Sequence, residues 1–245
     1  MKGKLALETT KKLLLNNGLL LLAYLVLQTI SNCASNQYIA LSTNMEATLQ
    51  LIAIVLYALC IASIVISLYK TFVVDLLLGK SYKYYSLPYK KSEIIFSKAI
   101  PAIIIEGIIA ALLFSDADLQ NLLVISFDKT GFTGVYRSEV LKELAFYLIK
   151  SFGQCLLLFS TVGFLILLAL VVSRSFDPSK TVRNLVLAII IEVLANCALY
   201  TVVKNVPSGG FEKYVPAIVG IIMGVEIICS IIASKVLADK RFNVL

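Results

Sequence analysis

The chain has 245 residues, of which 59% are apolar, and it carries a formal net charge of +7 at pH 7. Soluble domains are about 45–50% apolar, so this composition predicts a membrane protein and leaves no long polar block for a separate soluble domain. Histidine is absent, which excludes Ser-His and Cys-His catalytic pairs and imidazole zinc sites. The five cysteines form no CxxC pair, and we expect neither a disulfide framework nor a metal site.

The N-terminal residues 1–12 combine four lysines with leucine and alanine, and we expect them to form a short helix along the inner membrane interface. The start of the chain also resembles a signal peptide, with a lipoprotein-like cleavage site at Cys33. The residue before such a cysteine is normally small, and Asn32 does not fit that requirement. We therefore expect the first helix to be retained.

Six segments are long and apolar enough to cross a bilayer, which takes about 18 residues or more. They are Leu13–Ile30, Thr48–Leu68, Ile94–Phe114, Leu144–Val172, Leu185–Val203 and Tyr214–Ser234. The predicted fold is an all-α membrane protein, a single domain over 1–245 with six transmembrane helices. Residues 115–143 form the longest predicted outer loop, and its apolar stretch Leu119–Phe127 is too short to span.

Lysine and arginine are distributed unequally between the two sides of this arrangement. With the N-terminus in the cytoplasm, sixteen fall in inner segments and five in outer ones. The positive-inside rule then predicts that both termini are cytoplasmic and that the protein lies in the bacterial cell membrane. Contacts with anionic inner-leaflet lipids explain the positive net charge, and no nucleic-acid partner is needed.

The segment Leu78–Glu93, between the second and third spans, contains Gly79-Lys80-Ser81, the last part of a phosphate-binding loop. The first glycine of G-x-x-x-x-G-K-[ST] would fall at Val74, so we expect no nucleotide site. Residues 69–93 instead have the pattern of a cytoplasmic coupling segment. A helical continuation of span two is followed by tyrosines and by Leu87-Pro88, which redirects the chain. Ser92 is a candidate cap for the next helix.

The sequence FVVDLLLGKSYKYYSLPYKKSEIIFSK, Phe72–Lys98, joins an acidic residue and a glycine to aromatics, Leu-Pro, a basic-polar pair, Glu-Ile and Ser-Lys. These residues are Asp75, Gly79, Tyr84, Tyr85, Leu87, Pro88, Lys90, Lys91, Ser92, Glu93, Ile94, Ser97 and Lys98. The pattern resembles the cytoplasmic segment between helices two and three of type-2 ABC exporter permeases. It is particularly similar to the small bacterial permeases of peptide and lantibiotic export or immunity.

The resemblance implies a permease subunit that pairs with a second permease copy, or a homologous permease, and with cytosolic ABC ATPase subunits. ATP and magnesium would bind the partner ATPase, so no cofactor is expected in this chain and the chain itself is not an enzyme. The cargo class it implies is a peptide or another amphipathic molecule. ATPase contact is expected over Phe72–Glu93, with the short inner loop Ser173–Asn184 as a second candidate contact. The expected coupling residues are Phe72, Asp75, Tyr84, Tyr85, Leu87, Pro88, Lys90, Lys91 and Glu93.

Four ionisable residues fall inside predicted spans: Glu106, Lys150, Glu192 and Glu226. Such groups cost roughly 2.5–3.5 kcal/mol on insertion scales, so they should face protein or water. They are candidates for a polar transport pathway, and the alternative is that they hold helices together or reach the interface. Glu106 is the one in mid-span, whereas Lys150 lies near the outer end of its span.

Uncharged residues in the spans indicate helix packing. The amides Asn16, Asn17, Gln154 and Asn196 are predicted interhelical hydrogen-bond partners. Gly220 and Gly224 form a G-x-x-x-G on the last span, which permits close helix approach either within the subunit or at a dimer seam.

Three other functions stay open at the sequence level. The chain could be a six-span small-molecule binding subunit of a transporter, which predicts one deep ligand pocket. It could be a membrane-embedded enzyme, which without histidine needs a carboxylate pair among Glu106, Glu192 and Glu226. It could also be a non-transporting immunity or scaffold membrane protein.

Overall fold

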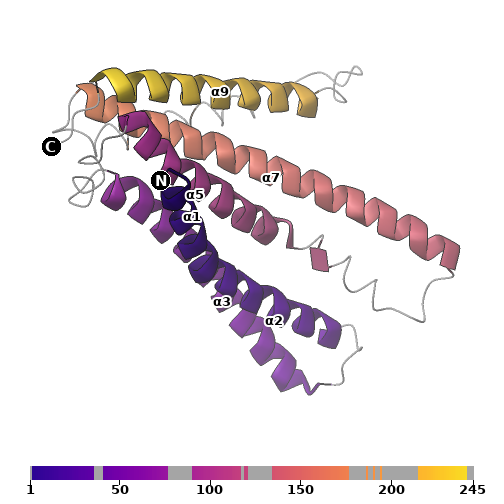
Figure 1. Ribbon diagram of the computed structural model, residues 1–245. Coiled ribbons are helices and arrows are strands. Elements are labelled where there is room, and N and C mark those ends of the chain that lie inside the picture. Colours follow the sequence, from indigo (N-terminus) through magenta and orange to yellow (C-terminus); the bar gives the residue numbers. More distant parts are fainter. Residues whose placement is uncertain are drawn as a thin grey trace. The chain divides into compact units, whose positions relative to one another are not determined.

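The computed structural model of the chain describes residues 2–35, 41–76, 90–116, 119–120, 134–176 and 215–241, together with 186, 190 and 194. All regular structure in these ranges is helical (Figure 1). The elements are α1 (Lys2–Leu13), η1 (Leu14–Gly18), α2 (Leu19–Ser35), α3 (Thr43–Tyr69), η2 (Lys70–Asp75), α5 (Lys91–Phe114), α7 (Gly134–Phe176) and α9 (Val215–Arg241). The elements η1 and η2 are π-helical stretches.

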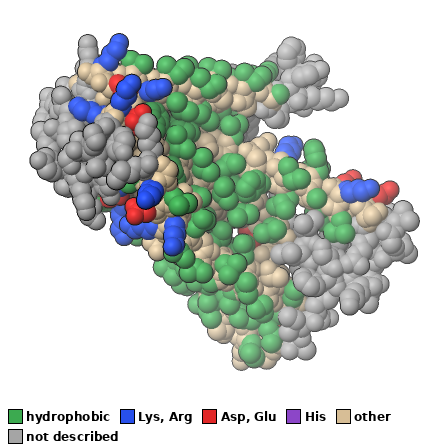
Figure 2. All heavy atoms as spheres, viewed as in Figure 1, with side chains coloured by type: hydrophobic (Ala, Val, Ile, Leu, Met, Phe, Trp, Pro, Cys, Tyr) green, Lys and Arg blue, Asp and Glu red, His purple; other side chains and the backbone are tan. Residues whose placement is uncertain are grey.

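Five helices in the described ranges are long and apolar enough to cross a membrane. They are Gly3–Ser35, Thr43–Asp75, Lys91–Phe114, Ser138–Ser175 and Ala217–Lys240. They overlap five of the six predicted spans and confirm the expected all-α membrane fold for this part of the chain. The remaining predicted span, Leu185–Val203, lies outside the described residues except for 186, 190 and 194, which are helical. Hydrophobic side chains cover most of the visible helix surface in Figure 2, as lipid contact requires.

The first span and the lysine-rich start belong to one helical run. No break separates residues 2–13 from the span, because α1 passes through η1 directly into α2. The second span is extended in the same way, since α3 continues through η2 to Asp75. Each π-helical stretch lets a long helix absorb one extra residue without ending.

Contacts divide the chain into two compact units. One unit contains residues 1–7, 68–104 and 157–245, and the other contains residues 8–67 and 105–156. We call them the α7–α9 unit and the α2–α3 unit. The helices α1, α3, α5 and α7 each contribute residues to both units.

In the α2–α3 unit, the first two spans run antiparallel. Gln50 Nε2 donates to Ser35 Oγ at one end of the pair, and Asn17 Nδ2 donates to Ser67 Oγ at the other. Between these bonds, the Tyr24 and Tyr57 rings lie 5.6 Å apart. The C-terminal part of α5 runs parallel to the first helix, because Glu106 contacts Asn17 and Asp116 contacts Tyr24.

In the α7–α9 unit, one hydrophobic cluster joins η2, α5, α7 and α9. Its buried members are Phe72, Leu76, Ile95, Ala99, Ile103, Phe164, Leu167, Leu170, Val171 and Ala238. Within this unit α7 and α9 run in the same direction (Figure 1). Gly220 faces Leu157 near the beginning of this shared path, and Ala238 joins the cluster around Val171 near its end.

Two helices of the α7–α9 unit approach each other closely at Gly163 of α7. A Cβ added at Gly163 would lie 2.9 Å from Cγ1 and 3.0 Å from Cγ2 of Ile103. Real Cβ atoms do not come this near, so glycine is required for α5 and α7 to pack at this distance.

Candidate functional site

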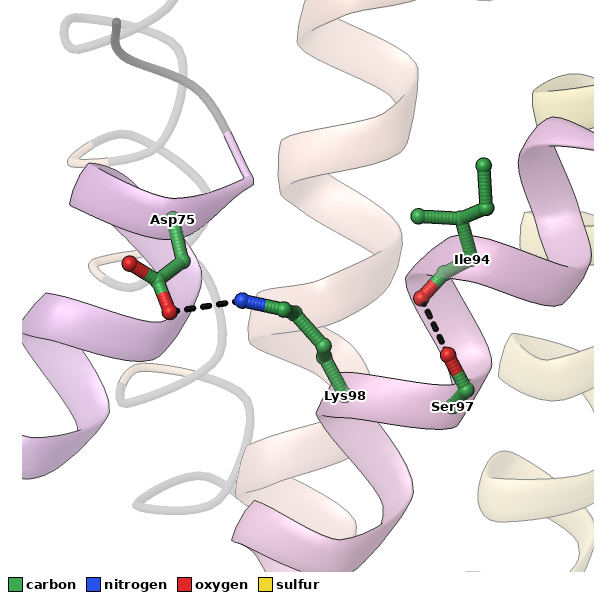
Figure 3. Close-up of polar contacts among 4 residues, drawn as sticks. All are labelled: Asp75, Ile94, Ser97 and Lys98. Carbon is green, nitrogen blue, oxygen red and sulfur yellow. Dashed lines mark hydrogen bonds and ion pairs between the residues drawn. The ribbon is translucent and has the colours of Figure 1, made fainter. Parts of the chain in front are cut away.

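The base of the predicted coupling segment is closed by a partly buried ion pair. Asp75 is the last residue of η2, and Lys98 lies in the second turn of α5. Lys98 Nζ lies 2.7 Å from Asp75 Oδ2, and the two side chains are 3% and 24% exposed (Figure 3). Because these residues flank the connection between the second and third spans, the ion pair fixes the two ends of that connection to each other.

Packing around the ion pair attaches this base to the neighbouring helices. Phe72 and Leu76 on one side of the connection and Ile95 on the other are all buried in the hydrophobic cluster. The backbone N–H of Ser92 donates to Asp239 Oδ1 of α9 at 3.2 Å, so the last helix also holds the start of α5. Since α5 begins at Lys91, Ser92 lies inside the first turn and does not occupy the N-cap position expected for it.

The structure describes only the flanks of the predicted coupling residues. Phe72 is buried, Lys90 is exposed, and Lys91 and Glu93 are half-buried. The central residues of the pattern, Gly79, Tyr84, Tyr85, Leu87 and Pro88, lie outside the described residues. The second contact expected at Ser173–Asn184 is described only as far as Phe176.

A second polar site is buried in the α2–α3 unit, around the mid-span carboxyl of Glu106. Glu106 has no exposed surface, and Asn17 on η1 is 3% exposed. Asn17 Nδ2 donates to Glu106 Oε1 and, at 2.8 Å, to Ser67 Oγ, while Ser63 Oγ donates to Asn17 Oδ1. One side chain on the first helix therefore connects two serines of α3 to the carboxyl group of α5.

The hydrogen bonds of this site leave one atom without a partner. Glu106 Oε2 is buried and has no hydrogen-bond partner in the described part of the chain. Its other oxygen receives the Asn17 amide. We call Asn17, Ser63, Ser67 and Glu106 the Glu106 cluster.

The other predicted pathway residues do not join the Glu106 cluster among the residues described. Lys150 is exposed on α7, and Glu226 is half-buried on α9, where it has an interaction of its own. Glu192 lies outside the described residues. Of the predicted amide partners, Asn17 makes interhelical bonds as expected, whereas Asn16 and Gln154 are exposed and Asn196 is not described.

The G-x-x-x-G of the last span makes little contact within the described chain. A Cβ at Gly220 would lie 3.9 Å from Leu157 Cδ2, which is ordinary packing distance, and one at Gly224 would meet nothing within 4 Å. The two glycines are thus not needed for close packing inside this subunit, and a role at a dimer seam stays a prediction. Gly163, which the sequence analysis did not select, is the glycine that packing requires.

Sequence reasoning also missed a polar group near the end of α5. Tyr24 OH donates to Asp116 Oδ2 at 2.7 Å, and Gln120 Nε2 donates to Asp116 Oδ1 at 3.1 Å. The signal that could have found it is the tyrosine inside the first apolar run, because a buried tyrosine hydroxyl needs a hydrogen-bond partner.

The helices and their apolar surfaces define the class of this protein: it is a multi-pass, all-helical membrane protein. The chain matches no protein-family model, no curated protein and no solved structure. The resemblance of Phe72–Lys98 to exporter permeases therefore depends on its own residue pattern.

Proposed function

We propose that this chain is the transmembrane permease subunit of an ATP-driven ABC exporter. A separate cytosolic ATPase hydrolyses ATP and pushes on the coupling segment between α3 and α5. A second permease copy, or a homologous permease, completes the pathway. The cargo is a peptide or another amphipathic molecule that leaves the cytoplasm or the inner leaflet.

The observation that carries this proposal is the Asp75–Lys98 ion pair at the base of the coupling segment. A segment that transmits force needs a stiff attachment, since a flexible base would absorb the movement. Here the ion pair and the buried Phe72, Leu76 and Ile95 attach both ends of the segment to one hydrophobic cluster. The helices α3 and α5 leave this base as continuous helices, so a displacement of the segment moves both of them.

The proposal is tested by crosslinking in the membranes of the native host. A photoreactive amino acid replaces Tyr85 in the coupling segment, and a matched variant carries it at Thr130 in the predicted outer loop. We expect position 85 to capture a protein that contains a complete phosphate-binding loop, identified by mass spectrometry, and position 130 not to capture it. Capture of that ATPase at position 130 alone, or at neither position, contradicts the proposal.

The captured ATPase is then co-purified with the chain in lipid nanodiscs. We expect the permease to stimulate ATP hydrolysis, and we expect the stimulation to fall about tenfold in the Pro88→Ala, Leu87→Ser and Asp75→Asn variants. Lys90→Gln and Lys142→Gln each replace an exposed lysine, in the coupling segment and on α7 respectively. Comparing the ATPase stimulation of the two variants separates an effect specific to the segment from a general effect of removing a positive charge. If all three coupling variants stimulate ATP hydrolysis as fully as the wild type, the coupling segment does not link the permease to the ATPase.

A further inference from the structure

If Glu106 were ionised, the hydrogen bonds of the Glu106 cluster would leave its negative charge uncompensated. An ionised carboxylate accepts hydrogen bonds at both oxygens, and a buried one also needs a nearby positive charge. Glu106 receives one donor at Oε1, and Oε2 receives none from the described residues. The group is completely buried and lies 15 residues after the start of a 24-residue membrane helix.

No charged side chain of the described α2–α3 unit balances a negative charge on Glu106. Asn17 of η1, which donates to its carboxyl, is uncharged, and so are Ser63 and Ser67 of α3, which hydrogen-bond Asn17. None of the other titratable side chains described in this unit forms a hydrogen bond or an ion pair with Glu106: Glu8, Lys11, Lys12, Tyr24, Cys33, Glu46, Tyr57, Cys60, Asp116, Glu139, Lys142, Glu143, Tyr147, Lys150 and Cys155.

We propose that Glu106 is a proton-binding site, with the proton held on Oε2 while the Glu106 cluster is closed. A proton removes the uncompensated charge and needs no additional space. The hydroxyl it creates is neutral, and an unpaired neutral donor costs less in a buried site than an unpaired charge. Oε1 stays the acceptor for the Asn17 amide, so the observed contacts are kept.

This site links proton binding to helix packing. A hydrogen bond to an ionised acceptor is stronger than one to a neutral acid. Loss of the proton strengthens the Asn17–Glu106 bond but leaves a buried charge, which becomes favourable only where water reaches Oε2. Proton release is therefore coupled to separation of α5 from the first two spans, whether or not the chain is part of an ABC exporter.

The test is infrared difference spectroscopy on the purified full chain in lipid nanodiscs, recorded as a function of pH. A protonated carboxylic acid has a carbonyl stretching band that a carboxylate lacks. We expect this band in the wild type, its loss in Glu106→Gln, and its full retention in Glu143→Gln, since Glu143 is an exposed side chain on α7. Absence of a band that depends on Glu106 at every pH at which the chain is folded would overturn the proposal.

A second variant keeps the test decisive if Glu106→Gln does not fold. Wild type and Glu106→Asp are both prepared with 13C-carboxyl glutamate. The acid band should move to lower frequency in the labelled wild type and stay in place in labelled Glu106→Asp, because the acid is then an unlabelled aspartate. The same isotope shift in both proteins would assign the proton to another glutamate and overturn the proposal.

Sodium titration separates a proton from a metal cation at this site. We expect the pH midpoint of the acid band to be the same in sodium chloride and in choline chloride at equal ionic strength. A midpoint that falls as sodium rises would show that sodium competes for Oε2, and the site would then be a metal-cation site.

Discussion

At the scale of single residues, the position of Glu106 could be predicted and its partners only in part. A carboxyl group in mid-span has to face protein, and Glu106 is buried as expected. Asn16 and Asn17 are adjacent and lie in a run that is apolar on all sides, so no periodicity indicates which of them faces inward. The structure selects Asn17, which lies in the π-helical stretch η1.

The neighbouring asparagines provide a matched pair of substitutions. Asn17→Leu removes the donor to Glu106 and to Ser67 and leaves buried polar atoms without partners, which costs about 1–3 kcal/mol each. Asn16→Leu replaces an exposed side chain of the first span and should leave stability unchanged or raise it. Thermal unfolding in the same detergent should show a clear fall in Tm for Asn17→Leu alone. Equal Tm values for the two variants would show that the Glu106 cluster does not stabilise the fold.

At the scale of elements, apolar windows located the spans, but the helices extend beyond them. The second span was predicted as Thr48–Leu68, and the helix runs over 43–75 with η2 included. A hydropathy window detects only the apolar part of a helix that crosses the lipid. Backbone hydrogen bonds continue the helix beyond that part, into the polar region at the membrane surface. The π-helical stretches have no signal in composition, and Gly163 lacks a second glycine at the spacing of the familiar packing motif.

The approach of α5 and α7 at Gly163 can be tested against a glycine on the same helix. Gly163→Ala forces Ile103 to move and should destabilise the chain by about 1–3 kcal/mol. Gly153→Ala is the control, because nothing lies within 4 Å of a Cβ there, and it should be neutral or stabilising. Chemical unfolding followed by circular dichroism compares them. Adding Ile103→Ala to both variants should narrow the difference in the free energy of unfolding between Gly163→Ala and Gly153→Ala. If that difference does not change, the clash does not involve Ile103.

At the scale of the whole molecule, chain direction supports the sixth predicted span. The helices α7 and α9 follow each other in the described part of the chain and run in the same direction in their unit (Figure 1). Two consecutive spans with one direction need a return crossing between them, and 185–203 is the apolar segment available for it. Composition alone does not provide this argument, because it carries no information on the direction in which each helix runs.

The number of spans is tested by locating the two termini. Single cysteines replace Gly3 and Asn243 in a chain whose five native cysteines are serine or alanine. With six spans and a basic inner side, a membrane-impermeant maleimide should label neither position in intact cells and both after lysis. Glu139→Cys, in the predicted outer loop, should be labelled in intact cells. Labelling of position 243 but not position 3 would indicate an odd number of spans.

The 43 residues of α7 have a consequence for access from water. At 1.5 Å per residue, such a helix is about 65 Å long, while the hydrocarbon layer is about 30 Å thick. Even at a steep inclination of about 40° it still rises about 50 Å, so part of it emerges from the lipid. The exposed Glu139, Lys142 and Glu143 identify its N-terminal turns as the emerging end. An antibody or a soluble ligand that binds these turns would bind the same helix whose C-terminal part packs in the hydrophobic cluster beside the Asp75–Lys98 ion pair.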